Sequence, residues 1–324
     1  MFGLIETELT PRPVGWERIR SALGRADGVS VTEERVWGAV LARTRVRFRC
    51  GDGPERNRRR VAAALAFLRG MGVRGVVTPA GFAYGDLLPA YGLAASTPVP
   101  LYRRLAARLA VHAADRLGVG ADRLRVCVVA KRATPEVAAA AEALCPRARF
   151  LSLLLDRPDV TGLCRALRRR HGVSVMENPA GAALADTDVY LVFDAWPVPL
   201  SLPAKPGAVV LALAGGEFDL PPGCLVADGA RLAPPRRLRD GWPWEADPEA
   251  LLAALYAAGA VRLDEIKLER LPLQRTGGSG QSGFLSAAGL TRNFNLTNRG
   301  EIHILTGNVI SPERLSFPEK LTIV

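Results

Sequence analysis

The sequence has few of the residues on which common metal and nucleophilic sites depend. It has only three histidines, and none stands in an HExxH motif or another paired spacing of the kind that a zinc site requires. It also contains no GxSxG nucleophile elbow and no GxxxxGKS or GxxxxGKT phosphate loop. We therefore predict no metal site and neither of these two site types.

Cysteine is sparse as well. The five cysteines form no CxxC pair, which is the spacing typical of redox and metal motifs. One of them falls within a predicted buried strand. The pattern indicates reduced thiols and a cytoplasmic location, because disulfides rarely persist there. The cysteines are Cys50, Cys127, Cys145, Cys164 and Cys224.

Long hydrophobic runs are absent. Apolar stretches such as 61–68 and 251–258 are far shorter than the roughly 20 residues of a membrane-spanning helix. Residues 1–13 include acidic side chains and no long apolar stretch, so they do not resemble a signal peptide. We expect no membrane partner.

Lysine and aromatic residues are scarce, whereas arginine is abundant. Only four of the 43 basic residues are lysines, and the formal net charge is +11. Such an excess favours nucleic acid, anionic membrane surfaces or phosphorylated ligands as partners. A GC-rich genome would produce the same arginine and alanine enrichment. We favour that explanation, because the charges are spread over several helices and no zinc-finger or RNA-recognition signature is present.

The chain is longer than one typical domain, which predicts two. Strand-like apolar runs alternate with helical patterns, so the predicted fold class is α/β. The first unit covers 1–120, with helices at 54–71 and 101–117 and a strand at 73–78. The second unit covers 121–264, and a compositionally distinct tail covers 265–324.

The second unit is organised around residues 125–156, which predict a strand, a helix and a second strand. Residues 126–130 and 150–155 are short apolar runs typical of strands buried in parallel sheets. Between them, Thr134 can cap a helix that begins at Pro135. These elements indicate a Rossmann-like sheet, doubly wound and mostly parallel. Further strands are predicted at 172–176, 188–193, 208–214 and 224–227, and helices at 160–170 and 248–258.

The first turn of this unit departs from the dinucleotide-binding pattern. That pattern has a glycine-rich turn and, about 20 positions later, an acidic residue that holds the ribose. Residues 130–135 contain no glycine, so a pyrophosphate cannot approach their backbone in the usual way. Lys131 and Arg132 beside Thr134 at the helix start could still bind a lone phosphate or carboxylate, with Asp156 in the ribose position. Alternatively, both cations are solvated and Asp156 is an exposed turn residue.

Two carboxylates are candidates for catalysis at the same edge of the sheet. Ligands of doubly wound sheets bind beyond the carboxyl ends of the strands. Asp194 and Glu217 each closely follow a predicted strand, and Trp196 could provide a stacking face. Such a pair could perform acid–base chemistry. The alternative is that both are structural or solvated loop residues.

Arginines at the start of the 54–71 helix oppose the helix dipole. A bound anion would explain them, and solvated surface arginine is the simpler explanation. The four residues are Arg56, Arg58, Arg59 and Arg60.

The tail differs in composition from the rest of the chain. Both glutamines and four of the six asparagines lie there. Gly278, Gly280 and Gly283 formally match GxGxxG, but no clear buried strand precedes them, so a flexible linker is favoured. The remaining residues predict short strands, such as 301–305, or disorder.

The element order over about 125–260 is similar to that of shikimate-type and amino-acid dehydrogenases, whose second domain is Rossmann-like. Their glycine fingerprint and catalytic Lys–Asp signature have no counterpart here. The leading hypothesis is a protein that binds a small anionic or nucleotide-like ligand at the strand ends without ordinary dinucleotide chemistry.

Two alternatives stay open, and the sequence does not decide whether the chain is an enzyme. The first is an NAD(P)-dependent oxidoreductase with an atypical turn. In that case Asp156 would favour NAD, because a carboxylate repels the 2′-phosphate of NADP. The second is a non-enzymatic, arginine-rich interaction or nucleic-acid-binding protein.

Overall fold

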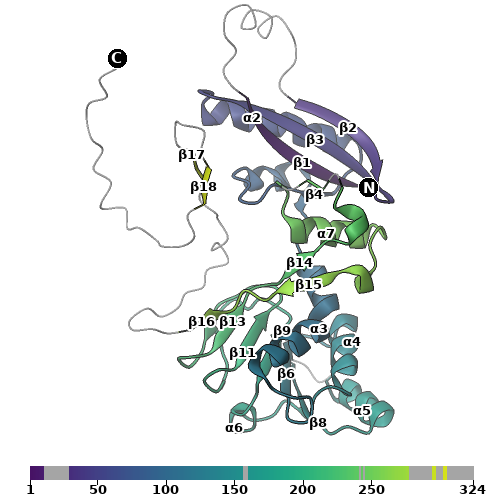
Figure 1. Ribbon diagram of the computed structural model, residues 1–324, viewed down its shortest axis with the longest axis vertical. Helices are drawn as coiled ribbons and strands as arrows, with labels where there is room; N and C mark the ends of the chain where they lie inside the picture. Colours follow the sequence, from purple (N-terminus) through teal and green to yellow (C-terminus); the bar gives the residue numbers. More distant parts are fainter. Residues whose placement is uncertain are drawn as a thin grey trace, which may run out of the picture.

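The computed structural model contains two α/β units stacked along its long axis (Figure 1). Each has a largely parallel sheet with helices against it, which confirms the α/β fold class and the Rossmann-like second sheet. The longer helices are α2 (Pro54–Gly70), α3 (Val99–Leu117), α4 (Pro135–Leu144), α5 (Val160–His171) and α7 (Pro248–Ala257). The structure describes residues 1–10, 29–155, 160–240, 242–243 and 245–276, and the backbone of 294–296 and 302–304.

The first unit contains a five-stranded sheet in the order β2-β3-β1-β4-β5. Strands β3, β1, β4 and β5 run parallel, and β2 pairs with β3 in the antiparallel sense. Two short 3-10 helices, η1 (Gly85–Leu87) and η2 (Pro89–Tyr91), precede β5. The strands are β1 (Phe2–Thr10), β2 (Val29–Val36), β3 (Ala39–Arg49), β4 (Gly75–Val77) and β5 (Ala94–Ala95).

Strand β1 contributes side chains to both faces of this sheet. Leu4 and Ile5 are both fully buried, and successive residues of a strand point to opposite faces. Ile5 belongs to the same cluster as Leu65 of α2. Leu4 belongs to a larger core that also contains Leu105 of α3 and Leu251 of α7. The first sheet therefore lies between its own helix and helices from farther along the chain.

The second unit contains a seven-stranded sheet in the order β16-β13-β11-β9-β6-β7-β8. The strands from β13 to β8 run parallel, and β16 is antiparallel at one edge. The chain runs outward from β6 to β8, returns to the centre at β9 and then runs outward in the other direction. The strands are β6 (Arg125–Ala130), β7 (Phe150–Leu155), β8 (Val175–Glu177), β9 (Val189–Val192), β11 (Val209–Ala212), β13 (Leu225–Ala227) and β16 (Gln274–Arg275).

The two faces of the second sheet are covered differently. Val128 of β6 lies in the large core with residues of α3, α4 and α5, whereas Val129 lies in a separate cluster on the other face. Leu202 packs in that second cluster. It directly follows β10 (Leu200–Ser201), which pairs with β12 (Phe218–Asp219). This ribbon explains why the sequence shows no clear helices between the last strands. A short helix, α6 (Gly181–Leu184), completes this side.

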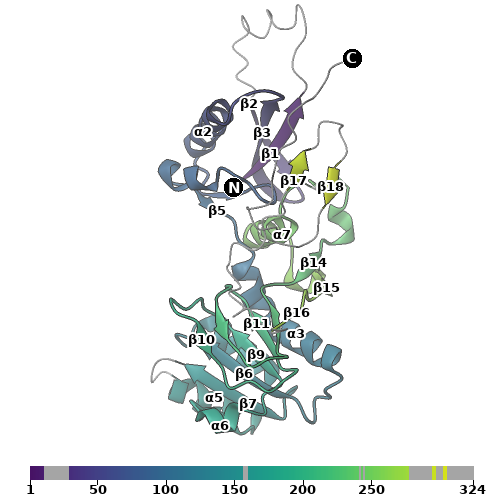
Figure 2. The ribbon, with the colours of Figure 1, turned by 90° about the vertical axis from the view of Figure 1, so that its left-hand side faces the viewer.

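Helix α7 and the pair of strands β14 (Arg231–Ala233) and β15 (Lys267–Arg270) lie between the two sheets (Figures 1 and 2). Helix α7 contacts both β4 and α3. Strand β14 pairs with β15, and β16 joins the second sheet. Folded strands thus occur within the stretch predicted as linker and tail. The domain boundaries at 120 and 264 stay predictions.

The distal tail contains one described feature, the antiparallel pair of β17 (Phe294–Leu296) and β18 (Ile302–Ile304). Strand β18 falls inside the predicted strand at 301–305. The GxGxxG match at Gly278, Gly280 and Gly283 lies outside the described residues.

All five cysteines are free thiols. Cys127 is fully buried, as its predicted strand required, and burial raises the pKa of its thiol to about 12. Cys145, Cys164 and Cys224 are also buried, whereas Cys50 is exposed. In the described part of the chain, no helix combines the length and the apolar character needed to cross a bilayer.

We predict that Leu105→Ala lowers the free energy of unfolding by roughly 2–5 kcal/mol, as is typical for a truncated core leucine. Because its core is continuous between the two sheets, unfolding should stay a single transition in thermal and denaturant melts. Exposed Val198→Ala is the control and should change stability by no more than about 0.5 kcal/mol. Two separate transitions, only one of them shifted, would contradict this account.

Candidate functional site

The candidate site lies at the carboxyl ends of β6 and β9, the two central strands of the second sheet. After β6 the chain enters α4 on one face, and after β9 it passes to the other face, where Trp196 packs. Connections that leave adjacent parallel strands in opposite directions create a topological switch point, where doubly wound folds bind ligands. We call this region, including the β6–α4 turn at 131–134, the strand-end edge.

The carboxylate of Asp194 joins three elements at this edge. The backbone N–H of Lys131, just after β6, donates to Asp194 Oδ2 at 2.8 Å. The Nη2 of Arg103 on α3 donates to Asp194 Oδ1, also at 2.8 Å. The Nε and Nη2 of Arg103 further donate to the main-chain oxygen of Phe193, at 3.1 and 2.9 Å. The crevice between β6 and β9 is thus spanned by the chain's own polar groups.

The amino end of α4 is also occupied from within the chain. Thr134 is its N-cap, as predicted, and accepts a hydrogen bond from the N–H of Val137 at 3.3 Å. Pro135 follows and has no N–H to offer a ligand. The Glu136 carboxylate pairs with Arg104 of α3 at 3.0 Å. A hydrogen bond from its own backbone N–H, another from Thr134 and the charges of Arg104 and Arg103 hold the pKa of Glu136 below its usual value.

Three consecutive residues of α3 cover this edge. Tyr102 Oη donates to the main-chain oxygen of Ala230, beyond the end of β13, at 3.0 Å. Arg103 reaches the end of β9, and Arg104 reaches the start of α4. The Tyr102 ring lies so close to Gly229 that a Cβ added there would be 2.9 Å from it. The first turns of α3 therefore lie where a ligand of a doubly wound sheet would otherwise bind.

The predicted cations behave differently from these arginines. Lys131 is half-buried and Arg132 is exposed, and neither forms an ion pair with a carboxylate in the described part of the chain. The Nζ of Lys131 lies 5.3 Å from the centre of the Trp196 ring. The structure thus brings Lys131, Arg132, Thr134 and Asp194 to one edge. Asp156, the predicted ribose residue, lies outside the described residues.

The proposed catalytic carboxylates are not joined by any hydrogen bond in the described structure. Both oxygens of Asp194 accept hydrogen bonds, whereas Glu217 contributes its main-chain oxygen, which accepts from the N–H of Leu200 at 2.9 Å. Gly215 and Gly216 before it have φ values of 69° and 137°, which side chains rarely tolerate. An acid–base role for Asp194 and Glu217 stays a prediction.

Three of the four arginines that open α2 have carboxylate partners within the chain, and Arg59 forms no ion pair among the described residues. Asp52 accepts hydrogen bonds from Arg56 at 3.0 Å and Arg60 at 2.6 Å, and Asp86 accepts one from Arg58 at 2.7 Å. Burial opposes ionisation of Asp52, but the two arginines outweigh it and hold its pKa below the usual value. Internal anions therefore offset the unfavourable position of Arg56, Arg58 and Arg60, and no ligand is required to explain these three.

The sequence did not reveal Arg103, Arg104 and Glu136 as parts of the site. Each fits an ordinary helix, and only the meeting of α3 with strand ends far away in the chain gives it a role. No group of three or more His, Cys, Asp and Glu side chains that could hold a metal ion occurs among the described residues.

Comparisons with known proteins give no family. No model of a known protein family matches the chain, and no curated protein matches it. Among solved structures, a transhydrogenase from Sinorhizobium meliloti is 14% identical, with a TM-score of 0.29, over 46% of this chain and 49% of that one. The chain thus spans about half the length of that protein.

Two further solved structures resemble larger parts of the chain. An ornithine carbamoyltransferase from Pyrococcus furiosus is 13% identical over 65% of this chain and 71% of its own, with a TM-score of 0.27. An L-tryptophan dehydrogenase from Nostoc punctiforme is 12% identical over 70% of this chain and 62% of its own, with a TM-score of 0.26. These scores are too low to support an argument about function.

We predict that Glu136→Gln is less stable than the wild type at neutral pH, because glutamine cannot supply the charge that Arg104 and the α4 amino end stabilise. A lowered folded-state pKa contributes stability above the ordinary glutamate pKa of 4.5, and this stability is lost as the pH falls through the folded-state value. Denaturant unfolding should therefore show a lower free energy of unfolding for Glu136→Gln than for the wild type at neutral pH, and this difference should disappear in acid. The difference in free energy of unfolding should be modest, since 27% of the Glu136 side chain is exposed.

The matched control is Glu33→Gln, a change at an exposed residue of β2 that forms no ion pair within the described chain. Its stability should follow the wild type at every pH. If Glu136→Gln were as stable as the wild type at neutral pH, or if its loss of stability grew in acid, the role given to this carboxylate would be contradicted.

Proposed function

We propose that this chain binds a small anionic or nucleotide-like ligand at the strand-end edge, with Lys131 and Arg132 holding the anion. One observation carries the proposal. Arg103 and Arg104 at this edge each have a carboxylate partner, whereas Lys131 and Arg132 have none in the described part of the chain. Two adjacent cations at a switch point, with no carboxylate partner among the described residues, favour an external anion.

The pose of this ligand differs from that of an ordinary dinucleotide. In the usual pose the pyrophosphate lies on the first helix N-terminus. Here Glu136 already fills that position and Pro135 removes one N–H donor, so a pyrophosphate would have to displace a carboxylate held by Arg104. A smaller anion on the outer side of the turn needs no such displacement.

Trp196 supports a planar ligand group. Its ring lies beside the ammonium of Lys131, and its indole Nε1 is buried without a hydrogen-bond partner. An aromatic ring next to a cation suits a base or another flat ring attached to an anion. The free thiols also support the proposed cytoplasmic location.

The oxidoreductase alternative is supported by one specific observation. The six parallel strands follow the order β8-β7-β6-β9-β11-β13, which is the strand order of dinucleotide-binding Rossmann domains. In this alternative Glu136 moves aside when the cofactor binds, and Asp156 contacts the ribose. The two proposals therefore differ in whether an intact dinucleotide binds better than its phosphate-bearing half.

We predict that AMP or inorganic phosphate raises the melting temperature of the wild type at fixed salt. A ligand at about 100 times its Kd adds about 2.7 kcal/mol of stability. Lys131→Glu should weaken binding at least about tenfold, since a hydrogen bond to a charged group contributes about 1.5–3 kcal/mol. Arg165→Glu, which changes an exposed arginine of α5, should leave the affinity within about twofold of wild type.

The same titration separates the alternatives. Binding of NADH but not of AMP or phosphate, reduced in both Lys131→Glu and Asp156→Ala, would favour the oxidoreductase. Steeply salt-dependent binding of DNA or RNA, with no response to small ligands, would favour a nucleic-acid-binding protein. Ligand binding that is equal in wild type and Lys131→Glu would refute the site proposed here.

A further inference from the structure

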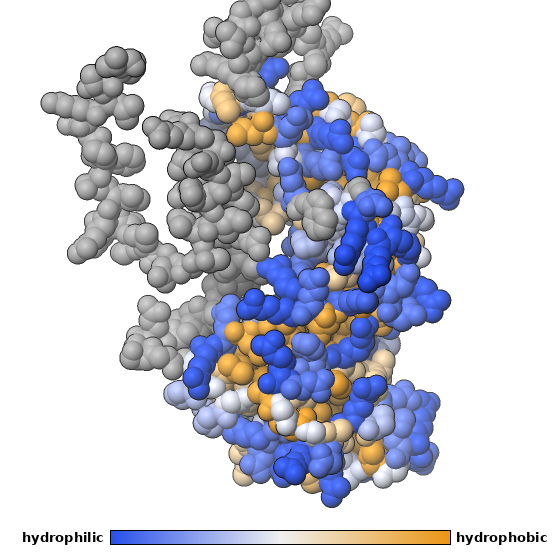
Figure 3. Space-filling view, in the orientation of Figure 1, coloured by the Kyte–Doolittle hydropathy of each residue, from blue (hydrophilic) through white to orange (hydrophobic). Residues whose placement is uncertain are grey.

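A groove of about 530 Å³ lies between the middle and end of α3, the end of α4 and the start of β15. This volume is in the range of small-molecule sites. Val111 and Leu268 are among its apolar lining residues, and Arg108, Arg147 and Lys267 supply its positive charge. Figure 3 shows hydrophobic residues gathered over the lower unit, in the region of α3 and β15, and bordered by hydrophilic ones.

Arg108 is held in place at this groove. Its Nη1 donates to the main-chain oxygen of Leu263, and its Nη2 donates to that of Ile266, both at 2.9 Å. These two carbonyls accept hydrogen bonds but carry no net charge, so the guanidinium keeps its full positive charge. A fixed cation binds an anion at a smaller entropic cost than a mobile one.

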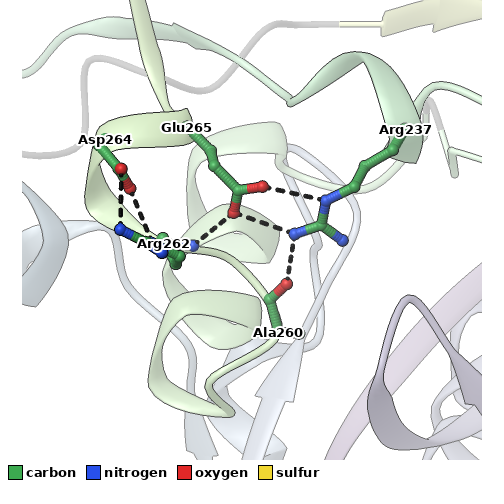
Figure 4. Close-up of polar contacts among 5 residues, drawn as sticks. All are labelled: Arg237, Ala260, Arg262, Asp264 and Glu265. Carbon is green, nitrogen blue, oxygen red and sulfur yellow. Dashed lines mark hydrogen bonds and ion pairs between the residues drawn. The ribbon is translucent and has the colours of Figure 1, made fainter.

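Two acidic residues near Lys267 in the chain, Asp264 and Glu265, are already paired, whereas Glu269 of β15 forms no ion pair among the described residues. Glu265 in η4 (Leu263–Glu265) accepts from the Nε and Nη2 of Arg237 in η3 (Arg236–Leu238), at 3.1 and 3.0 Å (Figure 4). It also accepts from the backbone N–H of Arg262 at 2.8 Å. The fork from Arg237 and these further contacts hold the pKa of Glu265 below its usual value.

The neighbouring carboxylate is occupied in the same way. Asp264 accepts from the Nε and Nη2 of Arg262, at 3.1 and 3.0 Å. Both carboxylates of η4 are thus paired with arginines. Lys267, two residues after η4, forms no ion pair in the described structure. Arg147, beyond the end of α4, likewise has no carboxylate partner among the described residues.

The charge of the groove suits a phosphate. Three permanent cations line it, and Asp115 is the one carboxylate among its lining residues; His112 also lines it. The excess of positive over negative charge is two, which matches a phosphate monoester at neutral pH, with a charge of about −1.5 to −2. The apolar residues beside these cations can cover the rest of a small organic molecule.

We propose that this groove is a second ligand site, which binds a small organic phosphate. The phosphate contacts Arg147 and Lys267, with Arg108 behind them, and the apolar or aromatic body lies over Val111 and Leu268. The site does not depend on the strand-end edge. Val111 and Arg103 share α3 but lie about 12 Å apart along its axis, given a rise of about 1.5 Å per residue.

The test is isothermal titration calorimetry of the full chain with AMP, inorganic phosphate and adenosine. The combined variant Arg147→Glu with Lys267→Glu changes two exposed side chains, so the fold should be retained and is checked by circular dichroism. AMP should bind more tightly than phosphate, and adenosine should bind at least about tenfold more weakly than AMP. The combined variant should lose at least about tenfold in AMP affinity at one site.

Lys131→Glu and Arg165→Glu are the two controls. The groove proposal requires that AMP binding at this second site be unchanged in both. An AMP isotherm abolished by Lys131→Glu and unaffected by the groove variant would place the ligand only at the strand-end edge and refute the groove. Absence of AMP and phosphate binding in the wild type would refute both sites, whereas loss only in the groove variant would refute the strand-end edge alone.

Discussion

One carboxylate, that of Asp194, connects three elements at the strand-end edge of the second unit. Asp194 accepts from the backbone N–H after β6 and from Arg103 of α3, and Arg103 also binds the carbonyl of Phe193 after β9. Two strands and a helix are thereby held together at the topological switch point. In most doubly wound folds this crevice is left for a ligand. Here the hydrogen bonds and the ion pair of Asp194 and Arg103 occupy the crevice. We therefore expect the ligand farther out, on the β6–α4 turn.

Carboxylates within the chain also pair with many of the other arginines of this basic protein. At the start of α2, Arg56, Arg58 and Arg60 pair with Asp52 and Asp86. At the start of α3, Arg103 and Arg104 pair with Asp194 and Glu136. Arginine abundance therefore does not by itself indicate a nucleic-acid surface. More informative than the number of arginines is where cations without a carboxylate partner in the described chain lie beside a possible ligand site, as Lys131 and Arg132 do at the strand-end edge and Arg147 and Lys267 do at the groove beside β15.

Local sequence chemistry was sufficient to predict the six parallel strands and the longer helices of the second unit. Buried parallel strands read as continuous apolar runs, and Thr134 with Pro135 marks the start of α4 through capping alone. The short β10–β12 ribbon lacked such a signal, because two-residue strands carry no periodicity. The contact between Arg103 and Asp194 could not be predicted either, since 91 residues separate them and only tertiary packing brings them together.

A crystal structure of the protein with selenate tests the central claim most directly, because this sulfate-like dianion can be located by the anomalous scattering of selenium. We expect a peak beside Lys131 and Arg132, with the Glu136–Arg104 and Asp194–Arg103 pairs intact. A peak at the amino end of α4 with Glu136 displaced, or no peak near Lys131, would contradict the account. The first of these outcomes would restore the ordinary dinucleotide pose.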